Sequence, residues 1–357
     1  MEENIIASIE NHGKKPAIAI TMGDPCGIGP EVVVKAMADS RVYETCRPLV
    51  VGNVYAMEQA VSLTGATMTV KEVTDPTQSG MEPGVIDVVD IHNLNPEDIT
   101  VGEINPTCGK AAMEWVTRAG ELAMEGVVDA LATAPLNKEA ASLAGYKSIG
   151  HMELLQDLSN TKLVATMLMA KNLRVVHLST HRSLSLACEL VKKDRILDYL
   201  RLTHESFIRY GFEKPRIGTA ALNPHGSDGG LLGDEERLEI TPAIEAAQSE
   251  GIDATGPVPA DIVFHQAIQG QYDAVLCMYH DQGHIALKLI GFQAAVNVTL
   301  GLPIVRTSPS HGTAFDIAWQ GVANPAGMLA AVDSAIRLCQ HPPNAQHTHR
   351  QLQEQQD

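Results

Sequence analysis

The chain has 357 residues, a mass of 38.3 kDa, and 26 Lys and Arg against 43 Asp and Glu, which gives a formal charge of −17. The acidic balance argues against duplex nucleic acid or an anionic membrane as the main partner, because both require a positive surface. Aromatic residues make up only 4% of the chain, so stacking platforms for single-stranded nucleic acid are few. A small anionic ligand is compatible with this composition, because it needs only a local basic pocket.

The length suggests about two domains, and the hydrophobic content of 45% is typical of a globular protein. The six cysteines are widely spaced and form neither a CxxC pair nor a zinc-knuckle pattern. Such cysteines indicate reduced thiols in a cytoplasmic protein. The N-terminal segment lacks the apolar core of a signal peptide, and no apolar run is long enough to span a membrane.

In chain order, a polar lead-in of about 15 residues is followed by short apolar runs that alternate with amphipathic stretches. The runs predict strands at 17–22, 48–52, 85–91, 130–134, 163–169, 173–179, 217–222, 274–279 and 294–300. Residues 109–126 and 234–251 have apolar side chains at helical spacing, and both segments end in Gly. Strands that alternate with helices predict an α/β fold with mainly parallel sheets.

The pattern is interrupted at 134–138, which predicts a domain boundary there. We expect a first α/β lobe made of residues 1–134 and about 306–341. A second lobe, made of residues 135–305, is expected to contain the candidate metal ligands. Residues 342–357 have almost no apolar content, so we expect a disordered tail.

A Gly-rich segment runs from Met22 to Glu31 directly after the first predicted strand. Its spacing is not GxGxxG, and no Gly-Lys-Ser/Thr follows, so neither an ordinary Rossmann nucleotide site nor a P-loop is predicted. The segment could bring its backbone close to a ligand. It is equally consistent with a tight strand–helix connection.

Three histidines follow the ends of predicted strands: His181, His225 and His280. Ligands of open α/β sheets bind beyond the carboxyl ends of the strands, so three imidazoles could hold a divalent metal there. The spacings are not diagnostic, and three unrelated loop histidines are the alternative. His177 lies inside a predicted strand and is interpreted as a core residue.

Cationic and amide side chains near this histidine loop suggest a site for an anion. Lys288, Asn297 and Arg306 lie between apolar runs. Arg can bind a carboxylate or phosphate in bidentate fashion, and Lys acts as a point charge. Ordinary surface charge is the alternative. The sequence contains no GxSxG, HExxH or kinase motifs, which disfavours hydrolase, zincin and kinase functions.

Several motifs, taken in order, resemble the 4-hydroxythreonine-4-phosphate dehydrogenase family. They are Met22-Gly-Asp-Pro-x-Gly-Ile-Gly-Pro-Glu31, Asn223-Pro-His225, Gly256-Pro-Val-Pro-Ala-Asp261, Tyr279-His-Asp-Gln-Gly283 and Leu300-Gly-Leu-Pro-x-x-Arg306-Thr-x-x-x-His-Gly-Thr313. The matches extend from about residue 17 to about residue 330. Each motif alone is weak, but the ordered set is specific.

The resemblance implies a metal-dependent, NAD- or NADP-linked dehydrogenase that oxidises a 4-phosphorylated 3-hydroxy acid, after which the β-keto acid loses CO2. The implied fold has two α/β/α lobes, is similar to isocitrate and isopropylmalate dehydrogenases, and is not an ordinary Rossmann domain. It also implies a homodimer with shared active sites. The metal ligands would be His181, His225 and His280, and the substrate contacts would be His151, Met152, Lys288, Asn297 and Arg306. Lys288, Asp261 and Asp281 are candidate catalytic residues, the cofactor-binding residues are unassigned, and Zn2+, Mn2+, Co2+ and Mg2+ all suit such a site.

The sequence departs from the family pattern at Met152, where the family usually has Thr. A thioether cannot donate a hydrogen bond, so one substrate contact is lost or replaced. The segments 281–288 and 312–319 resemble a branch that acts on D-threonate or D-erythronate 4-phosphate, which is our main hypothesis. The alternatives are oxidation of 4-phosphohydroxy-L-threonine for pyridoxal phosphate synthesis, a cis-dihydrodiol carboxylate dehydrogenase, and a non-catalytic sugar-phosphate or metal-binding protein.

Overall fold

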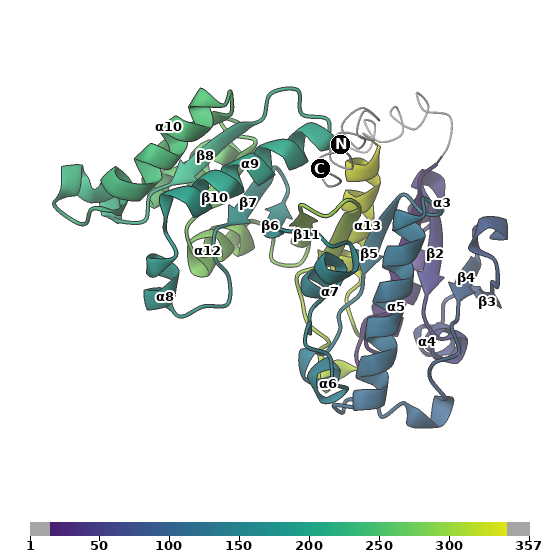
Figure 1. Ribbon diagram of the computed structural model, residues 1–357. Coiled ribbons are helices and arrows are strands. Elements are labelled where there is room, and N and C mark those ends of the chain that lie inside the picture. Colours follow the sequence, from purple (N-terminus) through teal and green to yellow (C-terminus); the bar gives the residue numbers. More distant parts are fainter. Residues whose placement is uncertain (1–14, 341–357) are drawn as a thin grey trace. The chain divides into compact units, whose positions relative to one another are not determined.

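The chain forms two compact units (Figure 1). The computed structural model describes residues 15–340. Unit 1 contains the described residues up to Lys162 together with Gln293–Cys339, and Leu163–Phe292 form unit 2. The predicted lead-in and the predicted disordered tail at 342–357 lie outside the described residues.

Unit 1 is built on a mainly parallel sheet. Its strands follow the order β3 (Thr69–Glu72), β4 (Val85–Val89), β2 (Arg47–Val51), β1 (Ala17–Thr21), β5 (Ala130–Thr133), β12 (Val305–Pro309) and β11 (Val296–Leu300). All neighbouring pairs are parallel except β11 and β12. Every residue of β1 is buried. A central strand covered on both faces requires such a continuous apolar run.

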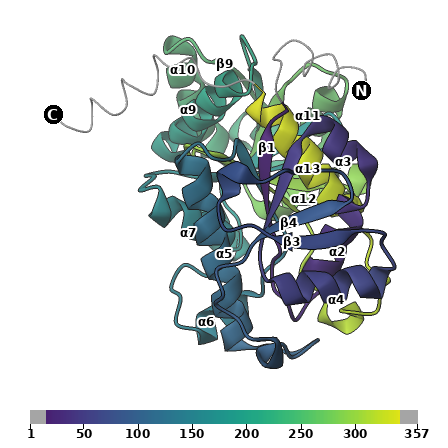
Figure 2. The same cartoon turned by 90° about the vertical axis from the view of Figure 1, so that its right-hand side faces the viewer.

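Helices cover both faces of this sheet (Figure 2). The helix α5 (Pro106–Met124) packs against β1 and β5 and is joined by α6 (Lys138–Leu143) and α7 (His151–Leu158). The opposite face is covered by α13 (Ala326–Cys339), which packs with α2 (Gly29–Met37) and α3 (Ser40–Thr45), and α4 (Val54–Thr64) packs beside α2. The helix α5 begins where the Asn105 side chain accepts the backbone N–H groups of Thr107 and Cys108. Short 3-10 turns lie at Pro76–Gln78, Pro96–Asp98 and Phe315–Ile317.

The strands of unit 2 follow the order β6 (Ala165–Ala170), β7 (Leu173–His177), β10 (Ala274–Cys277), β8 (Arg216–Ala220) and β9 (Asp253–Val258). Only the β6–β7 pair is antiparallel. The helices are α8 (Leu184–Glu189), α9 (Lys193–Arg209), α10 (Thr241–Ser249), α11 (Ala260–Ile268) and α12 (His280–Gly291). A 3-10 segment at Pro224–Gly230 and a π-helical turn at Glu236–Ile240 follow β8.

The predicted fold class is confirmed: both units are α/β, and the sheets are mainly parallel. All nine predicted strands are present, and the helix predicted at 109–126 is α5. The segment 234–251 is divided between the π-helical turn and α10. The prediction missed three strands. In β3 most side chains are exposed, β9 contains Gly and Pro, and β12 has polar residues although it is fully buried.

The unit boundaries differ from the predicted ones. The chain enters unit 2 after Lys162 rather than after residue 134, and it returns at Gln293 rather than at about 306. Residues 135–162 stay in unit 1 because α6 and α7 pack against α5. Residues 293–305 belong to unit 1 because β11 pairs with β12. The three candidate metal ligands lie in unit 2, as predicted.

All six cysteines are free thiols, as their spacing predicted. Within residues 15–340, none of the helices has both the length and the apolar character needed to cross a membrane.

Candidate functional site

The three candidate metal ligands follow the carboxyl ends of strands in unit 2. His181 lies after β7, His225 after β8, and His280 after β10. Since β7, β10 and β8 are parallel neighbours, all three histidines follow the same edge of the sheet. His181 and His225 have positive φ angles of 51° and 55°. This backbone conformation is uncommon outside glycine and is frequent at functional sites.

Two of these histidines lie together. The ring centroids of His181 and His280 are 5.5 Å apart. Both rings line a cavity of about 250 Å³, together with Ser179, Thr180, Arg182, Leu184, Ala187, Tyr279 and Asp281. Tyr279 immediately precedes α12, so the turn from strand to helix places His280 at the helix start.

Carboxylates orient two of the imidazoles. The Nδ1 atom of His280 lies 2.7 Å from Oδ1 of Asp281, and Nδ1 of His225 lies 3.1 Å from Oδ2 of Asp228. An ionised carboxylate only accepts, so each Nδ1 bears a proton, and in the neutral imidazole each Nε2 then keeps a lone pair. Such an outer carboxylate is the usual partner of a metal-binding histidine. Asp281, a candidate catalytic residue, therefore has an orienting contact with His280.

The donor chemistry of these histidines fits a divalent cation, but residues 15–340 of one chain do not bring a complete set of ligands together. Within the part of the chain that the structure describes, no three His, Cys, Asp or Glu side chains are grouped so that they could hold a metal. The His225 side chain is 71% exposed on the loop after β8. The three-histidine metal site thus stays a prediction, of which the structure brings two members together.

Two further histidines adjoin this pair. His284 lies one helical turn after His280, and the two rings are stacked with centroids 3.5 Å apart and an interplanar angle of 15°. The Nδ1 atom of His284 is 3.0 Å from Nε2 of His177. Burial, followed by the charge of neighbouring histidines, lowers the pKa of His177 to about 3 and that of His284 to about 4. Both rings are therefore neutral at physiological pH, and His177 is a core residue as predicted.

Arg306 is the most unusual charged residue of unit 1. It lies on β12 and is only 3% exposed. Its Nε and Nη2 atoms donate to Oγ1 of Thr133 at 3.1 and 2.7 Å, and Nη1 donates to Oγ1 of Thr299 at 3.3 Å. No carboxylate forms an ion pair with it within residues 15–340. Burial lowers the pKa of Arg306 to about 10, and the charge of Glu153 opposes this shift. A buried cation held by hydroxyl groups alone is suited to an incoming anion.

His151 is the first residue of α7, and the positive charge of Arg306 acts on its ring. Its pKa lies well below the usual range because of burial and then because of the positive charge of Arg306. Its Nε2 atom is shielded from solvent and finds no hydrogen-bond partner among the described residues. A neutral imidazole with an unused nitrogen can hydrogen-bond a ligand. The predicted substrate contacts His151 and Arg306 are thus coupled electrostatically in unit 1.

The other predicted site residues occupy varied positions. Met152 follows His151 in α7, and Asn297 is half-buried on β11 opposite Ser308. Lys288 is exposed on α12, one turn after His284, with Nζ 5.6 Å from the centre of the Phe292 ring. Asp261 is exposed in the first turn of α11. No hydrogen bond joins Asp261 to a histidine within residues 15–340, so its catalytic role stays a prediction.

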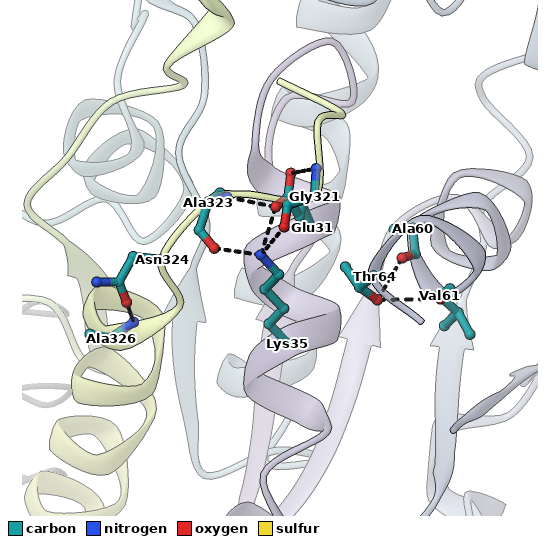
Figure 3. A network of polar contacts seen from close by, with 9 residues as sticks. All are labelled: Glu31, Lys35, Ala60, Val61, Thr64, Gly321, Ala323, Asn324 and Ala326. Atoms are coloured by element: carbon teal, nitrogen blue, oxygen red, sulfur yellow. Dashed lines mark hydrogen bonds and ion pairs between the residues drawn. The ribbon is translucent and has the colours of Figure 1, made fainter. Parts of the chain in front are cut away.

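The Gly-rich segment is a tight strand–helix connection, one of its two predicted interpretations. A Cβ atom on Gly23 would lie 2.4 Å from the Pro135 carbonyl oxygen. In α2, the buried side chain of Glu31 accepts hydrogen bonds from the backbone N–H groups of Gly321 and Ala323 and forms an ion pair with Lys35 (Figure 3). Lys35 also donates to the backbone carbonyl groups of Gly321 and Ala323. The connection thereby holds the loop that follows β12.

Sequence reasoning overlooked the residues that support the candidates. Thr133 ends β5, and its place in an apolar run predicts only a strand residue. His284 and Asp228 lie four and three residues after predicted ligands, a separation that brings side chains together in a helix or tight turn. That spacing could have identified both.

Solved structures of similar proteins show the class of protein to which the chain belongs. The chain resembles the solved structure of a 4-hydroxythreonine-4-phosphate dehydrogenase from Klebsiella pneumoniae, with 40% identity, a TM-score of 0.86, and coverage of 91% of this chain and 98% of that one. It also resembles a terephthalate 1,2-cis-dihydrodiol dehydrogenase from Burkholderia xenovorans, with 27% identity, a TM-score of 0.63 and the same coverage. The fold is that of α/β dehydrogenases that lack the Rossmann fingerprint.

The family follows from two further matches. The model of the family described as pyridoxal phosphate biosynthetic protein PdxA matches residues 44–335. A Halalkalibacterium halodurans protein, provisionally named D-threonate 4-phosphate dehydrogenase, is 44% identical over 328 residues, which are 92% of this chain and 98% of the relative. The chain belongs to the PdxA family. The predicted family and the predicted dehydrogenase class are confirmed.

Proposed function

We propose that the protein oxidises a four-carbon 4-phosphorylated 3-hydroxy acid, D-threonate or D-erythronate 4-phosphate, with NAD or NADP as hydride acceptor. The resulting β-keto acid then loses CO2. The sequence similarity to a relative with a D-threonate 4-phosphate dehydrogenase name supports this substrate class. The motifs at 281–288 and 312–319 favour the same branch.

One structural observation supports the proposal most strongly, namely the buried cation Arg306 without an ion-pair partner in the described chain. A phosphate or carboxylate oxygen would complete its hydrogen bonding and neutralise its charge. His151 lies within its electrostatic influence and has a neutral ring with an unused Nε2. Together, these two residues suit a substrate with both an anionic group and a hydroxyl group.

The chemistry assigns separate tasks to the residues. Arg306 and Lys288 would bind the anionic groups of the substrate, and Asn297 would contact its polar atoms. Nε2 of His151 would hydrogen-bond a substrate hydroxyl, since it has no other partner among the described residues and the lowered pKa keeps the ring neutral. Hydride would leave C3 for the nicotinamide and the hydroxyl proton would leave for a base. The electron pair of the C1–C2 bond would then remain on the substrate as CO2 departs, until a proton is added at C2.

A divalent cation would be held by His181, His225 and His280, whose imidazoles have the required donor chemistry. When bound, such a cation would polarise the substrate hydroxyl and stabilise negative charge on its oxygen. Asp281 and Asp228 would keep Nε2 of His280 and of His225 available by accepting from Nδ1.

A second copy of the chain is the proposed partner. Large apolar side chains are exposed on α8, on α12 and directly after α12: Leu184, which lines the cavity with His181 and His280, and Ile285, Leu289 and Phe292, with Leu289 84% exposed. Such a patch typically marks an interaction site. Only two of the three predicted ligands lie together in one chain, so a second chain could complete the set. We therefore infer a homodimer with shared sites.

Oxidation of 4-phosphohydroxy-L-threonine is the second candidate, favoured by the likeness to the Klebsiella pneumoniae structure. Met152 stands where the family pattern has Thr, and its thioether cannot donate the hydrogen bond that Thr provides, so one substrate contact of this family pattern is lost or replaced.

Purified protein loaded with Mn2+ or Zn2+ tests the proposal through NADH formation on D-erythronate 4-phosphate, D-threonate 4-phosphate and 4-phosphohydroxy-L-threonine, assayed side by side. Turnover of the first two alone is expected. Preference for the third would assign the protein to the second candidate. Absence of turnover with all three would refute both.

A further inference from the structure

We propose that His284, held in place by His177, positions the imidazole of His280 for binding a divalent cation. This inference rests on the proposed function, because it takes His280 as a metal ligand. His284 and His177 are positioning residues, since they act through the ring of His280.

Two contacts hold the His280 ring in place. Asp281 accepts its Nδ1–H at 2.7 Å and thereby holds one edge of the ring. His284 covers one face, with ring centroids 3.5 Å apart and nearly parallel planes. The helix α12 produces the second contact, because side chains four residues apart lie on the same face. The remaining nitrogen of His280, Nε2, is left for a ligand.

His284 is itself fixed by hydrogen bonds. Its Nδ1 atom lies 3.0 Å from Nε2 of His177 and 3.0 Å from the His280 carbonyl oxygen. A carbonyl oxygen only accepts, so Nδ1 of His284 is the donor. Nδ1 of His177 lies 3.4 Å from the carbonyl oxygen of Thr166 and donates to it, which leaves Nε2 of His177 as the acceptor. One set of tautomers therefore satisfies the whole chain of contacts.

The sequence keeps space for this arrangement. A Cβ atom on Gly283 would lie 2.5 Å from Nε2 of His177, closer than any real contact. A glycine between Gln282 and His284 therefore lets α12 approach His177. Apolar side chains in place of His177 and His284 could fill the same volume without the desolvation cost of two imidazoles. The presence of two histidines here is therefore explained by their positioning of the adjacent His280 ring.

The test measures cation affinity of the metal-free full-length protein by calorimetric titration with Co2+, and records the visible spectrum of the bound ion. His284→Phe keeps a ring beside His280 but removes the donor to His177. His284→Asn keeps a donor but removes the stacked ring. The exposed His265 on α11 provides the matched control His265→Phe. We expect both His284 variants to bind Co2+ about 10-fold more weakly or worse, with an altered spectrum, and His265→Phe to bind like the wild type.

His177→Leu removes the acceptor of His284 and provides an independent route if the His284 variants do not fold, as judged by circular dichroism. Its expected effect is a weaker Co2+ affinity. Wild-type Co2+ affinity in folded His284 variants or in His177→Leu would overturn the inference. If the wild type fails to bind Co2+, or if His280→Ala binds it normally, the metal assignment of the proposed function fails instead.

Discussion

The buried guanidinium of Arg306 gives the sharpest prediction, because its removal should separate function from stability. The substitution is Arg306→Met, which keeps a long apolar side chain and removes the charge. Burial lowers the pKa of Arg306 to about 10. This shift corresponds to a cost of about 3 kcal/mol for keeping the side chain charged in the folded chain.

Removal of the charge therefore stabilises the folded chain, and the loss of the hydrogen bonds made by Arg306 opposes this stabilisation. Arg306 donates to the hydroxyl groups of Thr133 and Thr299, and each such bond contributes about 1 kcal/mol. The two effects nearly cancel, so the free energy of unfolding should change by less than about 2 kcal/mol. Binding should respond differently. Loss of one charge-assisted hydrogen bond to an anion, about 1.5–3 kcal/mol, lowers kcat/KM by about 10- to 150-fold.

Urea denaturation and steady-state kinetics on the phosphorylated substrate measure the two quantities. The exposed Arg216, which pairs with Asp273 at the start of β8, provides the control Arg216→Met, for which unchanged kcat/KM is expected. The reasoning is refuted if Arg306→Met retains wild-type kcat/KM. It is refuted equally if the variant is destabilised by more than about 4 kcal/mol, because Arg306 would then be a structural residue.

Three further predictions concern stability and assembly. Glu31→Ala removes the carboxylate that pairs with Lys35 and that accepts two backbone N–H groups (Figure 3). Urea denaturation should therefore show a loss of about 3 kcal/mol in the free energy of unfolding, and a loss as small as that of the exposed control Glu58→Ala would contradict the network's role. Burial raises the pKa of Asp24 to about 6, so the folded state holds the proton more tightly than the unfolded state. The free energy of unfolding should therefore fall by up to about 3 kcal/mol as the pH rises from about 4 to about 6. Asp24→Asn should abolish that component, and an unchanged difference in unfolding free energy between these pH values would exclude it. Leu289→Glu places a charge among the exposed apolar side chains of α12 and should shift the protein from dimer to monomer in sedimentation analysis. A variant that sediments like the wild type would exclude this face as the dimer interface.

The sequence predicted those parts of the fold that depend on local composition. Strands such as β1 and β10 are continuous apolar runs because parallel strands are covered on both faces. The strand β12 was not predicted because its buried residues include the polar side chains of Arg306 and Thr307, which hydrogen-bond to residues distant in the sequence. The unit boundary was misplaced because the packing of α6 and α7 against α5 is a tertiary contact that leaves no local signal.

The candidate site was predictable to a similar extent. The histidines at strand ends were recognised from their position in the α/β pattern, and His181 and His280 do lie together. The supporting contacts were not predicted, because they depend on strand pairing: Thr133 lies on β5, far from Arg306 in the sequence, and Thr299 lies on the neighbouring strand β11. His284 is a near neighbour of His280, but its hydrogen bond to His177 depends on how α12 packs against β7.

The most direct test of the central claim is the stoichiometry of the products formed from D-threonate or D-erythronate 4-phosphate. The account predicts that each NADH is accompanied by one CO2 and one dihydroxyacetone phosphate, because oxidation at C3 is followed by loss of C1. NADH formation without release of CO2, or no NADH formation from either acid, would contradict it.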